Sequence, residues 1–319
     1  MTNNYPLISI QILSWNKAEE TLKAIQSALD QTYPNTEVVV VDNGSDDNSV
    51  ARIRQRFPQV TLVELDRNYG CPEGRNRGVP YCKGEFIFYM DNDALLHRKA
   101  VEQAWKSIRQ DERIGVVGGS VYPFTDYKKA NVNCALPNGD HRYVTSRFHG
   151  GVCLHRKTMY DTTGFYPGHY FYGGEESYLT MRMLSQEYYV LKDESVILWH
   201  IPSKISENNV EDLVNRQTNG LTNRLTFWPA EFAFIYTLKS LIRHPYQAIR
   251  YRVFGKWLTR WPRAITRKAT YAIKTRRPLS RSDIRLYYGL STDTHHSVKQ
   301  IKQAQVSYMR CLWHELLQG

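Results

Sequence analysis

The residues with the clearest chemical potential form an acidic turn, Asp91-Asn92-Asp93, which directly follows a strand-like run at 85–90. Two carboxylates two residues apart on a tight turn can converge on one divalent cation, and hard oxygen ligands suit Mg²⁺ or Mn²⁺. Short acidic turns are also common as solvated surface features, which is the alternative interpretation. The position of this turn after a buried strand favours metal binding.

A second carboxylate, Asp42, ends a run of valines at 38–41. At the carboxyl end of a strand, such a group can accept hydrogen bonds from a base edge or a ribose hydroxyl. The alternative is a helix N-cap, but Asp46 and Asp47 are already available to cap the helix that follows. The sequence therefore favours a ligand-binding role for Asp42.

The elements that position these residues alternate between strand and helix patterns along the first 111 residues. Strand patterns lie at 7–13, 37–41, 60–65 and 85–90, and helix patterns lie at 17–31, around 50–57, within 70–84 and at 96–109. Repeated βα units imply a parallel sheet with right-handed crossovers. Polar clusters follow the carboxyl ends of its strands, where open α/β sheets bind ligands. These clusters are Trp15-Asn16, Asp42-Asn43, Asn68 and Asp91-Asn92-Asp93.

The pattern changes in the rest of the chain. Residues 112–200 are less regular and predict a strand at 114–117, a basic turn at 155–157, a helix at 178–184, and one or two strands at 188–199 that end at His200. From residue 231 the pattern is helical, basic and aromatic, with a kink predicted at Pro245 and a last amphipathic helix at 298–317. Its apolar residues at helical spacing are Phe234, Leu238, Leu241, Ile249, Val253, Trp257 and Trp261.

Composition bounds the class of protein. The chain has 319 residues, of which 42% are hydrophobic and 23% charged, so it is expected to fold around a sizeable core without disulfides. Its five scattered cysteines lack CxxC spacing, which favours reduced thiols in the cytoplasm. They are Cys71, Cys82, Cys134, Cys153 and Cys311. We see no signal peptide and no apolar run of ~20 residues, so we expect neither a secreted nor an integral-membrane protein.

Charge divides the chain into two parts with different expected partners. Residues 1–200 hold 22 Lys and Arg against 24 Asp and Glu, whereas residues 201–319 hold 20 against 7. All of the net charge of +11 therefore comes from the last third of the chain.

Four ordered segments together resemble the family 2 glycosyltransferases. They are 8–16, the valine run through Asp42-Asn43-Gly44-Ser45, 68–78, and 88–93 with the acidic turn. The resemblance covers roughly residues 6–200. It implies an α/β protein of the GT-A fold, with a mostly parallel, Rossmann-like nucleotide-sugar-binding sheet, followed here by a basic helical C-terminal extension. It also implies an inverting transferase that moves a sugar from a nucleotide-diphosphate sugar to an acceptor hydroxyl.

The resemblance assigns the donor site residue by residue. Asp91 and Asp93 take the metal-binding positions that hold the donor diphosphate with Mn²⁺ or Mg²⁺, and His200 resembles the histidine that completes the metal site. The remaining donor-binding positions are Ser14, Trp15, Asp42, Asn68, Arg75, Asp91 and Asn92. The first strand departs from the family's Pro-Thr-Tyr with Leu13-Ser14-Trp15, which keeps a hydroxyl and an aromatic ring.

The resemblance also implies an acceptor site and a catalytic base. Gly150 and Gly151 match the family's glycine-containing acceptor segment. The pair Glu175-Glu176 stands where the family usually has Glu-Asp, and alignment on the second acid makes Glu176 the expected base and Glu175 the alternative. The alternative is that this acidic pair has no catalytic role and only stabilises the start of a helix.

These assignments predict a catalytic domain at 1–225, with a donor-binding part at 1–111 and an acceptor-binding part at 112–225. The basic region at 226–319 has three interpretations. The first is contact with an anionic membrane surface through 231–285, with a lipid-linked or glycan acceptor. The second, equally favoured, is a set of packed helices with a solvated basic face. Nucleic-acid binding ranks third, because no module signature is present. The expected location is cytoplasmic, at most peripheral on the inner face of the membrane.

Two other classes of protein remain as alternatives. A nucleotidyltransferase would share an α/β nucleotide site, but no glycine-rich, lysine-bearing phosphate loop follows the first strand. A non-catalytic nucleotide-sugar-binding or membrane-surface-binding protein would explain the unusual Glu175-Glu176 pair.

Overall fold

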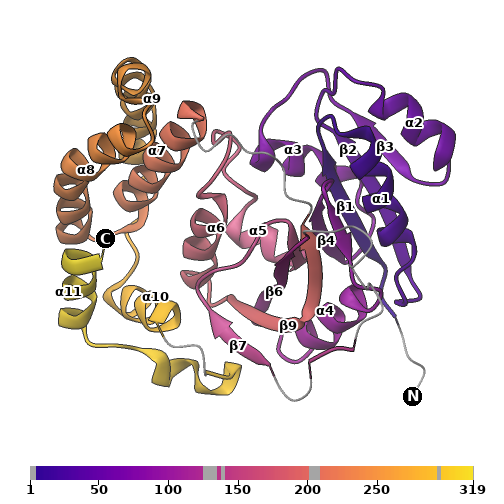
Figure 1. The fold of residues 1–319 in the computed structure, drawn as a ribbon. Coiled ribbons are helices and arrows are strands. Elements are labelled where there is room, and N and C mark those ends of the chain that lie inside the picture. The colour runs from indigo at the N-terminus through magenta and orange to yellow at the C-terminus, as the bar shows by residue number, and fades with distance from the viewer. Residues whose placement is uncertain (1–4, 125–134, 138–140, 201–208, 293–295, 319) are drawn as a thin grey trace.

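The structure, a computed structural model, describes residues 5–124, 135–137, 141–200, 209–292 and 296–318. A curled sheet with its covering helices forms one half of the molecule, and the C-terminal helices stand beside it as the other half (Figure 1). Among the cysteines in these ranges, Cys71, Cys82, Cys153 and Cys311 are free thiols, as expected. Cys134 lies outside the described residues.

The strands of the described residues form one sheet in the order β3-β2-β1-β4-β8-β6-β9-β5, with β7 paired to β9. Their bounds are β1 (Ile8–Ser14), β2 (Thr36–Asp42), β3 (Thr61–Glu64), β4 (Phe86–Asp91), β5 (Ala94–Leu96), β6 (Ile114–Pro123), β7 (Arg142–Thr145), β8 (Val152–Arg156) and β9 (Tyr189–His200). The part β3-β2-β1-β4 is parallel, as the sequence predicts, and β8 then joins β4 antiparallel.

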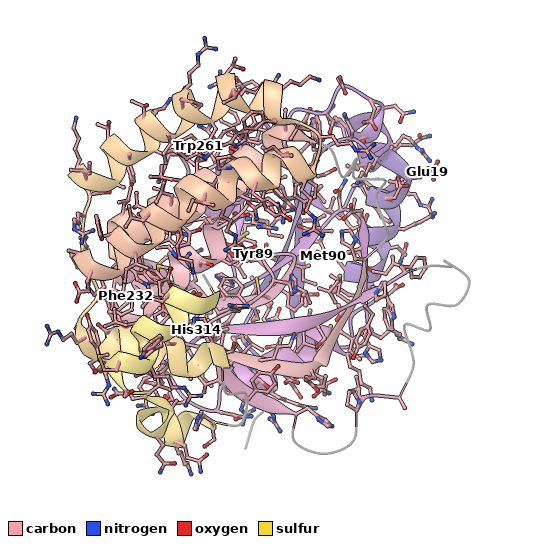
Figure 2. The ribbon with its side chains drawn as sticks, turned by 60° about the vertical axis from the view of Figure 1, so that its left-hand side comes forward. Glu19, Tyr89, Met90, Phe232, Trp261 and His314 are labelled. Carbon is pink, nitrogen blue, oxygen red and sulfur yellow. The ribbon has the colours of Figure 1, made fainter. Side chains whose placement is uncertain are left out.

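Helices cover both faces of the sheet. They are α1 (Ala18–Leu29), α2 (Ser49–Arg56), α3 (Cys71–Gly78), α4 (Ala100–Ile108), α5 (Tyr160–Thr163) and α6 (Glu175–Leu184). Val38 and Val40 of β2 belong to one apolar cluster, whereas Val39 and Val41 belong to the cluster on the other face. The valine run is therefore buried on both sides, which explains why it lacks alternation. Tyr89 and Met90 of β4 lie in the same interior (Figure 2).

Two expectations for this half are wrong. The helix predicted at 96–109 begins only at Ala100, because residues 94–96 form β5 and pair with β9. The basic turn predicted at 155–157 is the end of β8, and His155 is fully buried. The apolar run 94–96 has too few residues to distinguish a strand from a helix start by its period.

The other half consists of α7 (Val210–Phe227), α8 (Ala230–Arg250), α9 (Phe254–Lys274), α10 (Arg281–Thr292), a 3-10 turn at Val298–Ala304 and α11 (Tyr308–Gln318). Phe232 of α8 and His314 of α11 lie on this side (Figure 2). Val210 and Val214 of α7 pack with Ala248, Val253 and Trp257. The predicted domain boundary after residue 225 thus falls inside a helix that packs on α8 and α9.

For the helical half, one expectation stays a prediction and another is wrong. Pro245 lies inside α8, where a kink remains predicted, and the chain turns after the helix at 251–253, where Arg252 has a φ of 57°. The helix predicted at 298–317 is divided by residues 305–307. Within the described ranges, none of the helices has the length and apolar content that crossing a membrane requires.

Candidate functional site

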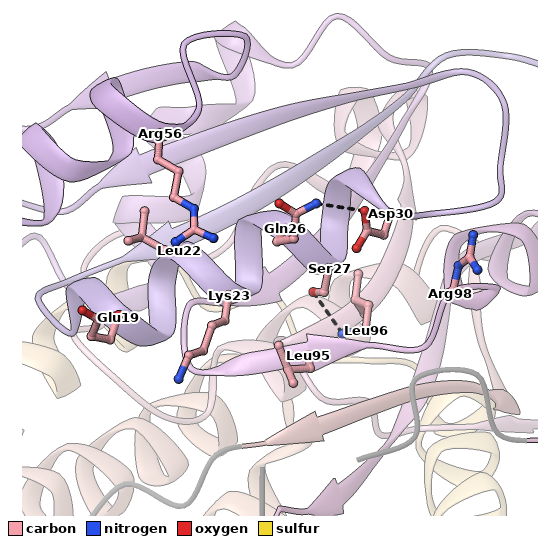
Figure 3. A pocket seen from close by; sticks show the side chains of 10 residues that line it. All are labelled: Glu19, Leu22, Lys23, Gln26, Ser27, Asp30, Arg56, Leu95, Leu96 and Arg98. Atoms are coloured by element: carbon pink, nitrogen blue, oxygen red, sulfur yellow. Dashed lines mark hydrogen bonds between the residues drawn. The ribbon is translucent and has the colours of Figure 1, made fainter. Parts of the chain in front are cut away.

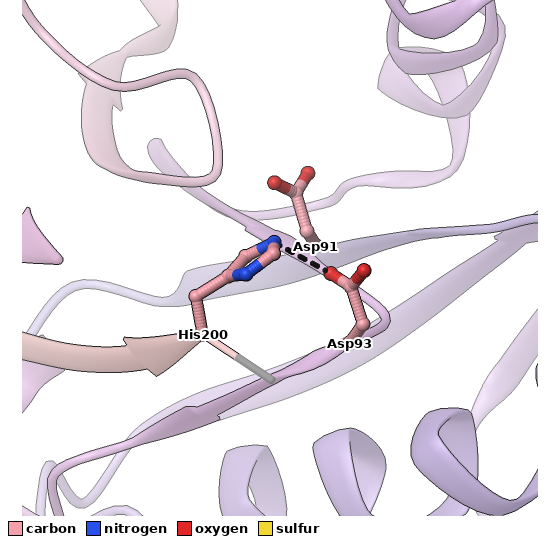
Figure 4. Close-up of side chains that lie close together, drawn as sticks. All are labelled: Asp91, Asp93 and His200. Carbon is pink, nitrogen blue, oxygen red and sulfur yellow. Dashed lines mark ion pairs between the residues drawn. The ribbon is translucent and has the colours of Figure 1, made fainter. Parts of the chain in front are cut away.

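Three potential metal ligands meet at one edge of the sheet. Asp91 ends β4, Asp93 lies between β4 and β5, and His200 ends β9, where it is in register with the first residue of β5. One ligand atom from each residue lies within 4.8 Å of the others (Figure 4). His200 Nε2 lies 3.2 Å from Asp93 Oδ1. Strand pairing thus brings together residues that are far apart in sequence.

Each carboxylate of this group also pairs with a basic side chain from outside it. Arg75 donates to Asp91 Oδ1 at 2.8 Å, and Lys17 Nζ lies 2.8 Å from Asp93 Oδ2. Burial alone would raise the pKa of Asp93, but hydrogen bonds from His200 and Lys17 outweigh it and hold that pKa below its usual value. The same hydrogen bond raises the pKa of His200. The carboxylates of Asp91 and Asp93 and the imidazole of His200 form a donor set that fits Mn²⁺ or Mg²⁺.

Gly150 and Gly151 lie between the acidic turn and α6. A Cβ on Gly151 would stand 2.1 Å from Asp91 Oδ2, and one on Gly150 would stand 2.8 Å from Glu176 Oε1. The backbone N–H of Gly150 donates to that same Glu176 oxygen at 3.2 Å. A Cβ at either position would crowd one of these carboxylates. The two glycines therefore let Asp91 approach Gly151 while Glu176 approaches the neighbouring Gly150.

The two glutamates of α6 have different surroundings. Glu175 is buried, and its Oε2 lacks a hydrogen-bond partner among the described residues. Burial and then the charge of Glu176 raise the pKa of Glu175 to about 7. Glu176 is half-buried. Glu175 is only 3% exposed, so an acceptor hydroxyl reaches Glu176 more readily than Glu175.

The predicted donor-binding residues line the same strand ends but differ in how far they are already engaged. The Asp42 carboxylate accepts from the backbone and hydroxyl of Ser45, and Asn68 Oδ1 accepts from Asn43 and Gly70. Trp15 is 52% exposed and presents a free aromatic face.

Ser14 and Asn92 face the interior rather than the site. The Ser14 hydroxyl contacts Thr21 at 3.2 Å, and the Asn92 amide donates to Thr21 and to the backbone of Asn16. These contacts tie the acidic turn to the start of α1. The geometry therefore assigns the Asn92 amide a hydrogen-bonding role between the turn and α1.

The sequence analysis did not single out Lys17, although its ammonium group contacts Asp93. Its signal was weak, because a lysine at the start of an amphipathic helix is ordinary. Lys17 has a φ of 60° and Asn16 one of 55°, so two successive non-glycine residues have the left-handed conformation. Such strained residues cluster at functional sites.

A cavity of about 600 Å³ lies elsewhere (Figure 3). It is lined by the outer side of α1, by Arg56 and by residues from 95–98, and it includes none of the predicted site residues. Its lining mixes both signs of charge. Because its lining includes no residue of the acidic turn, the cavity is separate from that turn.

Comparison with known proteins places this chain in a family. The model of Glycosyl transferase family 2 matches residues 9–176, which is more than half of the chain. Glycosyltransferase AglE of Haloferax volcanii is 31% identical over 126 residues, which are 38% of this chain and 41% of that protein. The chain spans about two fifths of the length of the curated relatives it matches.

Solved structures share the fold. The mannosyltransferase PcManGT from Pyrobaculum calidifontis, in complex with GDP-Man and Mn²⁺, has a TM-score of 0.54 at 20% identity over 85% of this chain and 74% of that one. GalNAc-T7 with UDP, GalNAc and Mn²⁺ has a TM-score of 0.60 at 13% identity over 83% and 58%. The fold is therefore the GT-A fold that the sequence resemblance implies.

Proposed function

The chain belongs to glycosyl transferase family 2, and we propose that it transfers a sugar from a nucleotide-diphosphate sugar to an acceptor hydroxyl with inversion at the anomeric carbon. The convergence of Asp91, Asp93 and His200 beside Gly150-Gly151 and Glu176 carries the proposal. It joins a candidate diphosphate site and a candidate base across two residues. The complex of PcManGT with GDP-Man and Mn²⁺, and that of GalNAc-T7 with UDP, GalNAc and Mn²⁺, support it.

Asp91, Asp93 and His200 would hold Mn²⁺ or Mg²⁺. When bound, the cation would supply positive charge that stabilises the departing diphosphate. Arg75 and Lys17 orient the two carboxylates and offset their repulsion. Trp15 offers an aromatic face to the nucleotide base, and Asp42 offers carboxylate oxygens to the base or ribose. The donor would be a UDP-, dTDP- or GDP-linked sugar.

Glu176 would act as the general base. It takes the proton from the acceptor hydroxyl while the acceptor oxygen bonds to the anomeric carbon and the bond to the diphosphate breaks. A single displacement inverts this carbon. The half-buried position of Glu176 beside Gly150, together with the burial of Glu175, favours this assignment over the reverse.

The test is a panel of UDP-, dTDP- and GDP-sugars assayed for transfer and slow hydrolysis, each with Mn²⁺ and with EDTA. We expect one donor to give Mn²⁺-dependent release of nucleoside diphosphate and an inverted product. Mn²⁺-dependent binding without turnover on any donor would favour a non-catalytic binding protein. Formation of nucleoside triphosphate and sugar 1-phosphate when pyrophosphate is added to a nucleotide sugar would favour a nucleotidyltransferase. Either result contradicts the proposal.

We also propose that the helical half meets an anionic membrane surface within residues 231–285, where a lipid-linked acceptor would be available. One face of α8 exposes large apolar side chains at helical spacing: Phe234, Leu238, Leu241, Ile242, Tyr246 and Ile249. Residues 232–282 contain 13 Lys and Arg and no Asp or Glu. Within the described residues, Arg243 and Arg250 of α8 form no ion pair. An apolar helix face with basic neighbours is typical of helices that lie on anionic lipid.

Flotation with vesicles of neutral and of partly anionic lipid tests this surface. We expect flotation only with anionic vesicles, and Ile242→Ser, which removes a side chain that is 78% exposed, should weaken it. The control is Phe165→Ser, an exposed aromatic residue of the sheet half. Flotation with neither lipid would contradict a membrane role and favour helices with a solvated basic face. Equal flotation with both lipids would contradict a preference for an anionic surface.

A further inference from the structure

The loop that leads into α6 has an unusual backbone. Gly173 and Gly174 have φ values of 80° and 87°, and a Cβ on either would stand about 3 Å from Arg216 or Asn219 of α7. The carbonyl group of Gly174 accepts the first hydrogen bond of α6, from the N–H of Tyr178 at 3.0 Å. The position of this loop therefore sets the position of Glu175 and Glu176 in the first turn of the helix.

Two asparagines of α7 hold the loop. The Asn219 amide donates to the carbonyl groups of Tyr172 and Gly173 at 3.0 and 2.6 Å. The Asn223 amide donates to the carbonyl group of Gly174 at 2.9 Å. Three consecutive loop carbonyls thus receive their hydrogen bonds from one face of α7.

These asparagines are fully oriented by their other contacts. Asn219 Oδ1 accepts from Lys268 Nζ of α9 at 2.5 Å, and Asn223 Oδ1 accepts from the Tyr170 hydroxyl at 2.7 Å. Both asparagine side chains are at most 1% exposed. Because unpaired buried amides are costly, this closed network has only one arrangement that pairs every group.

The segment just before this loop contacts α9. The ring of Tyr271 lies 3.9 Å from the ring of His169, two residues before the loop begins at Phe171. The helical half therefore contacts the loop through α7 and the segment just before the loop through α9.

We propose that Asn219, Asn223 and Lys268 are positioning residues for the α6 glutamates, an inference that rests on the proposed role of Glu176 as the base. The donor site is built by the sheet half, but the base would be set in place by the helical half. Transfer would then require both halves in one chain, even though no residue of α7 or α9 belongs to the proposed donor site.

The test uses the full chain with Asn219→Asp and Asn223→Asp. Each change keeps the oxygen that accepts from Lys268 or Tyr170 and removes the amide that donates to the loop. The matched control is Asn215→Asp, one turn earlier on α7, which adds the same charge beside Lys268 at 3.5 Å. A second perturbation, Lys268→Met, removes the ammonium group without adding charge.

We expect kcat to fall by about tenfold to a hundredfold in Asn219→Asp and Asn223→Asp, because small misplacement of a reacting group has effects of this size. The Kd for nucleotide with Mn²⁺ should stay unchanged. Hydrogen–deuterium exchange of a peptide spanning 170–176 should speed up in both variants and in Lys268→Met, but not in Asn215→Asp.

Faster exchange of the 170–176 peptide with unchanged kcat would overturn the positioning role. Unchanged exchange would show that the α7 asparagines do not hold the loop. Exchange requires no substrate. Should the wild type transfer no sugar, the proposed function fails while exchange still decides whether α7 holds the loop. Equal losses of kcat in Asn215→Asp and Asn219→Asp would show a charge effect and contradict the inference.

Discussion

The two halves of the molecule distribute polar and apolar residues in opposite ways. In the sheet half, valines and isoleucines are buried on both faces, and charged residues gather at the carboxyl ends of strands. In the helical half, α7 buries Asn219 and Asn223, whereas α8 exposes Leu241 and Ile242. Buried polar residues on one helix and exposed apolar residues on another indicate that each helix contacts something other than the apolar core of its own half. For α7 the partner is the loop before α6, and for α8 we propose lipid.

The largest effect we predict separates the two glutamates at the meeting point of the halves. Glu176→Gln should lower kcat by about 10²–10⁴-fold, the usual contribution of a general base, while leaving donor binding intact. Glu175→Gln, its neighbour, should lower kcat much less. Steady-state kinetics with nucleotide-binding measurements checks this. Full turnover by Glu176→Gln would remove it as the base, and a larger loss in Glu175→Gln would exchange the two roles.

A pair of isoleucines sharpens the contrast in burial. Ile25 of α1 is fully buried, so Ile25→Ala should reduce the free energy of unfolding by about 2–5 kcal/mol. Ile242 of α8 is 78% exposed, and Ile242→Ala should change it by no more than about 0.5 kcal/mol. Denaturant titration measures both. A large loss in Ile242→Ala would mean that α8 is covered in the protein in solution.

The glycine beside the acidic turn should be intolerant of even one methyl group. Gly151→Ala would place a Cβ against Asp91 Oδ2 and displace a candidate ligand, so Mn²⁺ affinity should fall by about 10–100-fold. The control is Gly255→Ala on α9, where a Cβ would meet no atom within 4 Å. Calorimetric titration with Mn²⁺ and nucleoside diphosphate compares them. Equal affinities in the two variants would separate Asp91 from the metal.

The smallest effect concerns pH and the buried His155. Burial, with the charge of Arg75 adding to it, lowers the pKa of His155 to about 3. Below pH 6.5 the unfolded chain binds a proton that the folded chain does not bind until about pH 3, so stability falls as pH falls through this window. The slope from this residue approaches about 1.4 kcal/mol per pH unit.

Unfolding at pH 7 and pH 5 tests this in His155→Gln, with exposed His149→Gln as the control. The variant should lose less stability on acidification than the wild type. Part of the slope should persist, because burial also lowers the pKa of His169 and of His244 to about 4. An unchanged slope in His155→Gln would show that His155 titrates normally.

The sheet half was largely predictable from sequence because its signals are local. Runs such as 38–41 have a strand pattern, and polar residues directly after them predict the edge where Asp42 and Asp91 lie. The pairing of His200 with the turn was not visible in local pattern and came from family resemblance. Lys17 was missed because its contact with Asp93 depends on how α1 meets the end of β1.

The helical half was predicted less well for a physical reason. The sequence analysis predicted no helix at 210–227, because its buried face is rich in Thr and Asn and has the pattern of a solvated surface. Its partners, the loop at 171–174 together with α8 and α9, make that face an interior. For α8 the apolar stripe predicted a helix correctly, but spacing alone did not say whether the stripe is buried or exposed.

Mn²⁺ binding to the full chain in the presence of nucleoside diphosphate, followed by electron paramagnetic resonance, tests the central claim most directly. Asp93→Asn removes a candidate ligand, and Asp46→Asn, an exposed acid after β2, is its control. We predict that Asp93→Asn weakens Mn²⁺ binding by at least about tenfold and that EDTA abolishes nucleotide binding by the wild type. Equal Mn²⁺ affinity in the two variants would contradict the account.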